Sequence, residues 1–71
     1  KFESPGNSGV PDRLCVFPGG RIAFAELKGK GGRLTALQTR QIHLLTTMGC
    51  DTDVLWSRAE VDKFIETRRR W

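Results

Sequence analysis

Residues 9–30 have the sequence GVPDRLCVFPGGRIAFAELKGK, with two short apolar runs on either side of Pro18-Gly19-Gly20. The runs RLCVF (13–17) and RIAFAEL (21–27) contain the β-branched and aromatic residues that favour strands. Proline supplies a fixed φ, and the two glycines tolerate the positive φ of a tight turn. This segment therefore predicts a β-hairpin with a three-residue loop.

A helix is predicted to follow the hairpin. Thr35 is a suitable N-cap for a helix over 36–48, and Gly49 is placed to end it. Apolar residues at helical spacing give this segment a broad stripe that we expect to face the core: Leu37, Ile42, Leu44, Leu45 and Met48.

The remainder of the chain predicts one more strand and one more helix. TDVLW (52–56) has strand composition, and Ser57 with Glu60 forms a capping-box signature. The last helix should turn Val61, Phe64 and Ile65 inward. The expected fold is α/β in the order β-β-α-β-α, with a mixed three-stranded sheet. Its second and third strands should be parallel, because a right-handed crossover helix joins them.

Length and composition suggest one small domain over residues 1–71. An apolar fraction of 38% argues against disorder. A chain this short buries only roughly 60% of its unfolded surface, so it usually needs support from a covalent cross-link, a metal or a partner chain. The net charge of +4 points to a polyanionic partner, of which nucleic acid is the commonest.

The same composition limits where the protein is expected to work. No run approaches the roughly 18 apolar residues of a membrane-spanning helix. Cys15 and Cys50 lack the spacing of a zinc site, and a buried free thiol is the ordinary interpretation of Cys15. Unpaired cysteines favour the reducing cytoplasm.

The mouth of the predicted hairpin carries an unusual set of charges. If Phe17 pairs with Arg21, Asp12 falls directly opposite Glu26, with Cβ atoms about 4.5–5.5 Å apart. Two like charges at that separation repel, and a divalent cation between them would remove the penalty. Without metal, neutralising either residue is expected to leave the fold intact or to stabilise it. Lys28 should point to the same side as Glu26.

Two carboxylates beside an ammonium suit metal-assisted phosphodiester hydrolysis. Mg²⁺ prefers oxygen ligands and keeps several waters, so two carboxylates and a backbone carbonyl are enough. The ion, Mg²⁺ or Mn²⁺, would polarise the phosphate and activate water, and Lys28 would orient that water or stabilise negative charge. The residues alone leave a plainer alternative open. Asp12 then only begins a turn after Pro11, while Glu26 and Lys28 are solvated charges at a strand end.

A family resemblance bears on this choice. Gly9-Val10-Pro11-Asp12-Arg13, the turn, Ala25-Glu26-Leu27-Lys28 and Gln38 in the next helix closely resemble the PD-(D/E)xK nuclease pattern. Within that superfamily the chain looks like the VRR-NUC group of small phage and bacterial nucleases, and Lys1-Phe2-x-Ser4-Pro5-Gly6 also fits that group.

This resemblance implies a metal-dependent DNA nuclease on a restriction-endonuclease-like core, in a bacterial or phage-infected cell. Asp12 and Glu26 would be metal ligands, the Leu27 backbone carbonyl a further ligand, and Lys28 the catalytic lysine. It also implies an acidic residue from a helix before the first strand. Residues 1–11 are too rich in Gly and Pro for that helix and contain only Glu3, so we expect it upstream of Lys1 or missing.

Four further features have competing interpretations. Gln38 should either bond back to the Thr35 N–H in a capping box or, as the resemblance implies, face the metal site. Lys28, Lys30 and Arg33 with three glycines suggest a phosphate-contacting loop, against a merely solvated turn. His43 is interpreted as a surface or interface histidine, against a general base. Arg68–Trp71 is interpreted as a frayed, charged tail, against a segment that binds the DNA backbone.

The sequence thus predicts a nuclease that cuts DNA with Mg²⁺ or Mn²⁺. The small core favours a homodimer, through the 36–48 helix or the 52–56 strand, and two sites would suit branched DNA such as a four-way junction. The alternative is a non-catalytic DNA-binding or nuclease-like interaction module.

Overall fold

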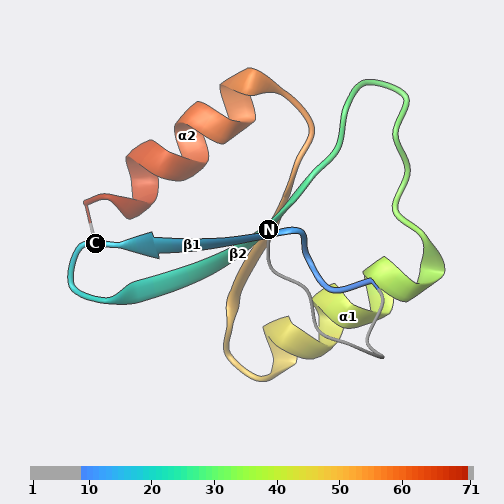
Figure 1. Cartoon of the computed structure of the whole chain (residues 1–71), viewed down its shortest axis with the longest axis horizontal. Helices are drawn as coiled ribbons and strands as arrows, with labels where there is room; N and C mark the ends of the chain where they lie inside the picture. The colour runs from blue at the N-terminus through green and yellow to red at the C-terminus, as the bar shows by residue number, and fades with distance from the viewer. Residues whose placement is uncertain (1–8, 71) are drawn as a thin grey trace.

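The computed structural model describes residues 9–70, which form a three-stranded mixed sheet and two helices (Figure 1). The elements are β1 (Arg13–Phe17), β2 (Arg21–Leu27), α1 (Ala36–Thr47), β3 (Asp51–Leu55) and α2 (Arg58–Arg68). The strand order in the sheet is β1-β2-β3. The predicted α/β class and β-β-α-β-α order are confirmed. The predictions made for Lys1–Gly6, Glu3 and Trp71 lie outside the described residues.

The hairpin has the register that its loop predicts. Phe17 pairs with Arg21, and the antiparallel register runs up to Arg13 opposite Ala25. The Gly20 N–H donates to the Phe17 carbonyl at 3.1 Å, while Gly19 has a φ of 87°. A positive φ at that turn position is what glycine supplies without strain.

Strand β3 lies parallel to β2 at the edge of the sheet, as the crossover through α1 predicted. Its register runs from Ala23 opposite Asp51 to Leu27 opposite Leu55. The strand begins and ends one residue earlier than predicted. Trp56 leaves it because its N–H donates to Glu60 Oε1 at 2.9 Å, at the start of α2. In a capping box the Glu60 side chain would bond to the Ser57 N–H, but here it bonds to the N–H of Trp56, one residue earlier. Ser57 caps the helix as predicted.

The hydrophobic core lies between one face of the sheet and α2. It consists of Ala23, Ala25, Leu55 and Phe64, with Cys15, Phe17 and Val61 packed against it. Cys15 is a free cysteine as predicted, but it is only partly buried, and this burial raises the pKa of its thiol. The prediction that Ile65 faces inward is wrong, since 46% of it is exposed. Val61, Phe64 and Arg68 share the inner stripe of α2, and Ile65 falls outside it.

Arg68 is part of this inner stripe and does not belong to a frayed tail. Its side chain is 13% exposed, and its Nε and Nη2 donate to the two carboxylate oxygens of Asp51 at 2.7 and 2.9 Å. The guanidinium also lies 3.7 Å above the Phe64 ring. Bidentate pairing and stacking of this kind use the planar shape of arginine. The contact therefore fastens the end of α2 to the start of β3.

Helix α1 begins and ends where the sequence predicts. Thr35 is the N-cap, and Gly49 follows the C-cap with a φ of 89°. The Gly49 N–H donates to Thr46 at 3.0 Å and the Cys50 N–H to Leu45 at 2.9 Å, which is a Schellman motif.

The predicted burial of the apolar stripe of α1 is wrong for the part of the chain described. No residue of α1 is buried, and Leu37, Leu44 and Met48 are exposed. The helix packs against β3, at one edge of the sheet, and lies on the other side of the hairpin from α2 (Figure 1). Its face of the sheet also exposes Leu14, Val16 and Ile22. Because α1 lies against β3, it leaves the β1 side of this face uncovered.

Candidate active site

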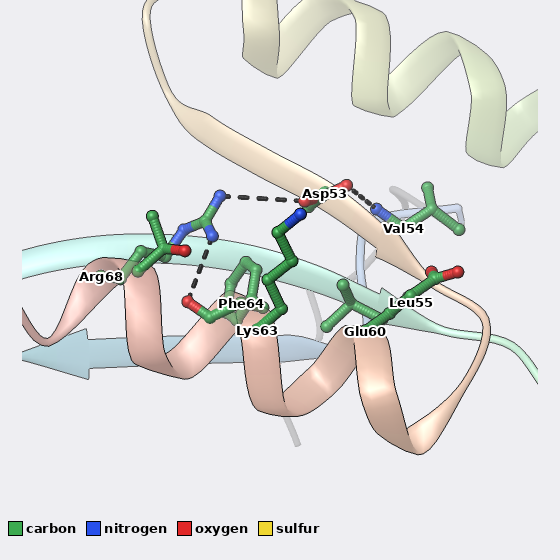
Figure 2. A pocket seen from close by; sticks show the side chains of 8 residues that line it. Asp53, Val54, Leu55, Glu60, Lys63, Phe64 and Arg68 are labelled. Carbon is green, nitrogen blue, oxygen red and sulfur yellow. Dashed lines mark hydrogen bonds and ion pairs between the residues drawn. The ribbon is translucent and has the colours of Figure 1, made fainter.

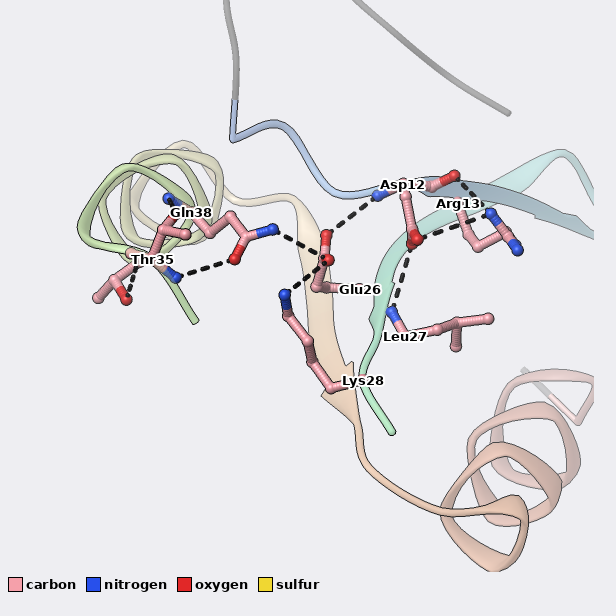
Figure 3. A network of polar contacts seen from close by, with 8 residues as sticks. Asp12, Arg13, Glu26, Leu27, Lys28, Thr35 and Gln38 are labelled. Carbon is pink, nitrogen blue, oxygen red and sulfur yellow. Dashed lines mark hydrogen bonds and ion pairs between the residues drawn. The ribbon is translucent and has the colours of Figure 1, made fainter. Parts of the chain in front are cut away.

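Asp12 and Glu26 lie opposite each other where the register places them, and each carboxylate bonds to the other strand. The Asp12 N–H donates to Glu26 Oε1 at 3.2 Å, and the Leu27 N–H donates to Asp12 Oδ1 at 3.3 Å (Figure 3). These reciprocal bonds give each negative charge a backbone donor. A hydrogen bond from a backbone N–H stabilises a carboxylate charge, so these bonds offset part of the repulsion between the two carboxylates.

Glu26 is the inner member of the pair and is only 4% exposed. Its Oε2 accepts a hydrogen bond from Gln38 Nε2 at 3.2 Å and lies 3.6 Å from Lys28 Nζ. With the Asp12 N–H at Oε1, three donors surround one buried carboxylate. A buried charge without such partners would cost several kcal/mol.

Asp12 is the outer member of the pair. Its side chain is 27% exposed, and Oδ2 lies 3.7 Å from the Arg13 guanidinium, which is itself half-exposed. The two carboxylates therefore differ in solvent access, so an incoming ion or phosphate would approach from the Asp12 side.

Lys28 lies beside Glu26 as the two-residue period of a strand predicts. It follows the last residue of β2, and its N–H donates to the Leu55 carbonyl at 2.9 Å, which continues the sheet. The side chain is 16% exposed. The ammonium is thus held at the carboxylate pair, and the interpretation of Lys28 as a solvated strand-end charge is wrong.

Gln38 has both of the roles that were predicted as alternatives, the capping box and the contact with the proposed metal site. Its Oε1 accepts from the Thr35 N–H at 2.9 Å, which closes the capping box, while its Nε2 donates to Glu26. The expectation that the side chain would do one or the other is wrong. An amide has an acceptor end and a donor end, and here each end has its own partner.

Gly9 and Pro11, which precede Asp12, fix the position of the site on α1. A Cβ on Gly9 would lie 2.8 Å from the Leu37 carbonyl carbon and 3.0 Å from the Gln38 nitrogen, and Gly9 has a φ of +90°. Pro11 is fully buried. The chain therefore crosses the first turn of α1 in close contact and enters β1 at Asp12. Residues 9–11 contributed to the prediction only through the family resemblance, and their contact with α1 was not predicted, although a glycine outside the hairpin turn is a signal of close approach.

The basic loop between β2 and α1 begins and ends at the site. Gly32 N–H donates to the Gly29 carbonyl at 2.9 Å, which folds the loop into a turn, and Lys30 and Arg33 are exposed on it. Lys28 precedes this turn and Thr35 follows it. Contact of Lys28, Lys30 and Arg33 with DNA stays a prediction, as does coordination by the Leu27 carbonyl. His43 is exposed on α1, as expected.

The donor set fits a hard cation that keeps water ligands. Asp12 and Glu26 supply carboxylate oxygens at one place, next to the basic loop. Within residues 9–70, no group of three or more His, Cys, Asp or Glu side chains is arranged to hold a metal. A closed, all-protein zinc site is therefore a poor match for the described residues, whereas Mg²⁺ is commonly bound by one or two carboxylates plus waters and phosphate.

A separate hollow of about 320 Å³ lies between β3 and α2 (Figure 2). Its lining includes Asp53, Leu55, Lys63, Phe64 and Arg68. In this sheet Ala23, Ala25 and Leu55 face α2, whereas Glu26 contacts α1, so the hollow and the carboxylate pair lie on opposite faces. None of the predicted site residues lines it.

Neither helix has the length and apolar run needed to cross a membrane, in the part of the chain described. No protein-family model matches the chain, and no solved structure matches it. The chain is 45% identical over 58 residues to a protein named "Putative nuclease p44" from Acyrthosiphon pisum secondary endosymbiont phage 1. That match covers 82% of this chain and 62% of the relative, so the chain spans less than two thirds of the relative's length.

Replacing Gly9 should damage the site more than replacing Gly19, a glycine with nearly the same φ. Gly19 has a φ of +87° and open space around it, so Gly19→Ala should lose only roughly 1–2 kcal/mol of stability to strain. Gly9→Ala adds a clash with the backbone of α1 and should lose about 1 kcal/mol more.

Urea unfolding of both variants measures this difference. Amide shifts of Asp12 and Gln38 should move in Gly9→Ala and stay in place in Gly19→Ala. Equal stability of the two variants would show that the segment before β1 does not depend on close contact with α1.

Proposed function

We propose that this chain is a metal-dependent nuclease module that hydrolyses DNA phosphodiester bonds, with Mg²⁺ or Mn²⁺ held by Asp12 and Glu26. The observation that carries the proposal is the buried Glu26 carboxylate, on which Asp12, Lys28 and Gln38 converge. The 45% identity to a phage protein named as a nuclease supports the same activity. The resemblance to VRR-NUC nucleases of the PD-(D/E)xK superfamily is part of the proposal.

Each site residue has a chemical task in this scheme. A divalent ion bound at the two carboxylates would polarise the phosphate and lower the pKa of a coordinated water. Asp12 N–H and Gln38 Nε2 hold Glu26 in a fixed orientation, and the Leu27 N–H holds Asp12. Lys28 carries a positive charge at the place where negative charge develops on the phosphate. The Leu27 carbonyl is proposed as a further metal ligand.

DNA is the proposed partner, in the cytoplasm of a bacterial or phage-infected cell. Lys28, Lys30 and Arg33 place three positive charges on or beside the loop next to the carboxylates, and the net charge is +4. Phosphate contacts from such residues supply most of the affinity of non-specific DNA binding. A branched substrate, such as a four-way junction, is proposed from the dimer described below.

Neutralising either carboxylate should abolish cleavage. Asp12→Asn and Glu26→Gln each remove a charged oxygen ligand, so neither variant should nick supercoiled plasmid in Mg²⁺ or Mn²⁺. Asp62→Asn is the matched control, because Asp62 pairs with Arg58 on the exposed side of α2. EDTA should stop cleavage by the parent chain.

Cleavage at the parental rate by both site variants would refute the ligand assignment. A parent chain that retards DNA and never cuts it would instead be a non-catalytic binding module.

The structure changes the expected effect of these variants on stability. Glu26→Gln leaves an amide among three donors in a buried place, so it should lose roughly 1–3 kcal/mol of stability, in contrast to the stabilisation expected from relieved repulsion. Asp12→Asn should lose less, because Asp12 is partly exposed.

Lys28 should affect the chemical step more than DNA binding. Lys28→Ala should lower the single-turnover rate by a factor on the order of 10² or more, with little change in Kd for DNA. Lys30→Ala is the control, since Lys30 is exposed and should affect DNA affinity alone. An equal loss of rate and affinity in Lys28→Ala would reduce Lys28 to a phosphate contact.

A homodimer is proposed because one apolar face is left uncovered among the described residues. Leu14, Val16 and Ile22 are 43%, 69% and 50% exposed on the face of the sheet that α1 only partly covers. The β3 edge is a poorer surface for pairing with a second copy. There the N–H groups of Val54 and Trp56 already donate to the carboxylates of Asp53 and Glu60, both at 2.9 Å. A two-fold dimer through the α1 face would supply two sites for two DNA strands.

Sedimentation equilibrium tests this dimer. The parent chain, of 8.0 kDa, should sediment with twice that mass at micromolar concentration. Ile22→Lys should shift the mass toward the monomer, whereas Ile65→Lys should not, although Ile65 is 46% exposed on α2. An 8.0 kDa monomer that is folded and cuts DNA would overturn both the dimer and the proposed branched substrate.

A further inference from the structure

The start of α1 is connected to the buried carboxylate by a chain of three groups. The Thr35 backbone N–H donates to Gln38 Oε1 at 2.9 Å, and Gln38 Nε2 donates to Glu26 Oε2 at 3.2 Å (Figure 3). The Thr35 hydroxyl completes the capping box by accepting from the Gln38 N–H at 3.0 Å. The same residues therefore begin the helix and bond to the proposed metal ligand.

The two partners of Gln38 allow only one orientation of its amide. An N–H group can bond only to the oxygen end, and a carboxylate only to the nitrogen end. If the amide flipped, its NH₂ would face the Thr35 N–H and its oxygen would face the Glu26 carboxylate. Both contacts would then be repulsive, and a buried carboxylate would lose one of its donors.

We propose that Thr35 is a positioning residue for the metal site, acting through its backbone N–H on the Gln38 amide and so on Glu26. This inference rests on the proposed function for the role of Glu26. The Thr35 hydroxyl serves the helix, whereas the N–H sets the direction of the Gln38 donor. The two groups of one residue thus have separable effects.

The backbone of Thr35 makes this separation testable. Thr35 has a φ of −75°, which proline can adopt. Thr35→Pro therefore deletes both the N–H and the hydroxyl while keeping φ, whereas Thr35→Ala deletes the hydroxyl and the methyl group but keeps the N–H, so the difference between the two variants reports on the N–H. Gln38→Met deletes both ends of the amide and keeps the length of the side chain. Ser57→Ala, which removes the corresponding cap hydroxyl of α2, is the control for a general loss of stability.

Mn²⁺ binding, measured by calorimetry without DNA, gives the first result. Thr35→Pro and Gln38→Met should each raise the Kd for Mn²⁺ about tenfold, as loss of an outer partner of a metal ligand does. Ser57→Ala should melt at lower temperature and keep the parental Kd, and Thr35→Ala, which retains the N–H, should raise the Kd less than Thr35→Pro does. The Thr35→Pro, Gln38→Met double variant should bind no worse than Gln38→Met, because both changes break one chain of contacts.

Nuclear magnetic resonance of the metal-free protein gives the second result. The Thr35 amide proton should be protected from exchange in the parent chain and lose that protection in Gln38→Met. The side-chain NH₂ signals of Gln38 should shift in both Thr35→Pro and Glu26→Gln. Unchanged Gln38 signals in Thr35→Pro would overturn the inference.

If Thr35→Pro failed to fold, Gln38→Met would be the deciding variant. Parental affinity for Mn²⁺ in Gln38→Met would overturn the inference that Thr35 positions Glu26 through Gln38. A parent chain that bound no Mn²⁺ would refute the proposed function, and the exchange data would still decide whether Thr35 orients Gln38.

Discussion

The buried carboxylate of Glu26 is the constraint around which this small fold is arranged. A charged group that is 4% exposed requires several donors, and no single element of the chain can supply them. The chain before β1 contributes the Asp12 N–H, the residue after β2 contributes Lys28, and α1 contributes Gln38. The helix start, the hairpin mouth and the strand end therefore have to meet at one point. The proposed metal site lies at that point.

The sheet separates this polar site from the apolar core by the alternation of its side chains. In β2, Ala23 and Ala25 face the core with α2, while Glu26 faces α1. Small side chains on the core face allow Phe64 to pack closely, and its ring meets Phe17 edge-on at 6.2 Å. Arg68 then fastens α2 to Asp51 of β3. Stability thus comes mainly from one face of the sheet, which leaves the other face for charged and incompletely covered groups.

The comparisons and the geometry support the same activity through independent observations. The phage relative carries a nuclease name over a match that covers 82% of this chain. The geometry of the candidate site is a separate observation that does not depend on this match. It offers two carboxylates of unequal exposure, an ammonium beside the inner one, and a basic loop that begins and ends at the same place. The proposed metal-assisted attack on a phosphodiester would use each of these groups.

Local sequence determined the strands and helices of this protein and, through them, the relative positions of part of the candidate site. Pro18-Gly19-Gly20 fixed the loop, the loop fixed the register, and the register placed Asp12 opposite Glu26 and Lys28 beside it. The helix caps at Thr35, Gly49 and Ser57 could also be predicted from the sequence, because the hydrogen bonds at the two ends of a helix involve residues only a few positions apart.

Only the tertiary structure decided how Gln38, Gly9 and Arg68 act. Each of them contacts a group that is remote in sequence or lies on another element, and such contacts depend on the three-dimensional packing of whole elements. The burial of α1 was mispredicted for the same reason, since an apolar stripe reveals which face of a helix could be buried but does not reveal how far the sheet beneath it extends.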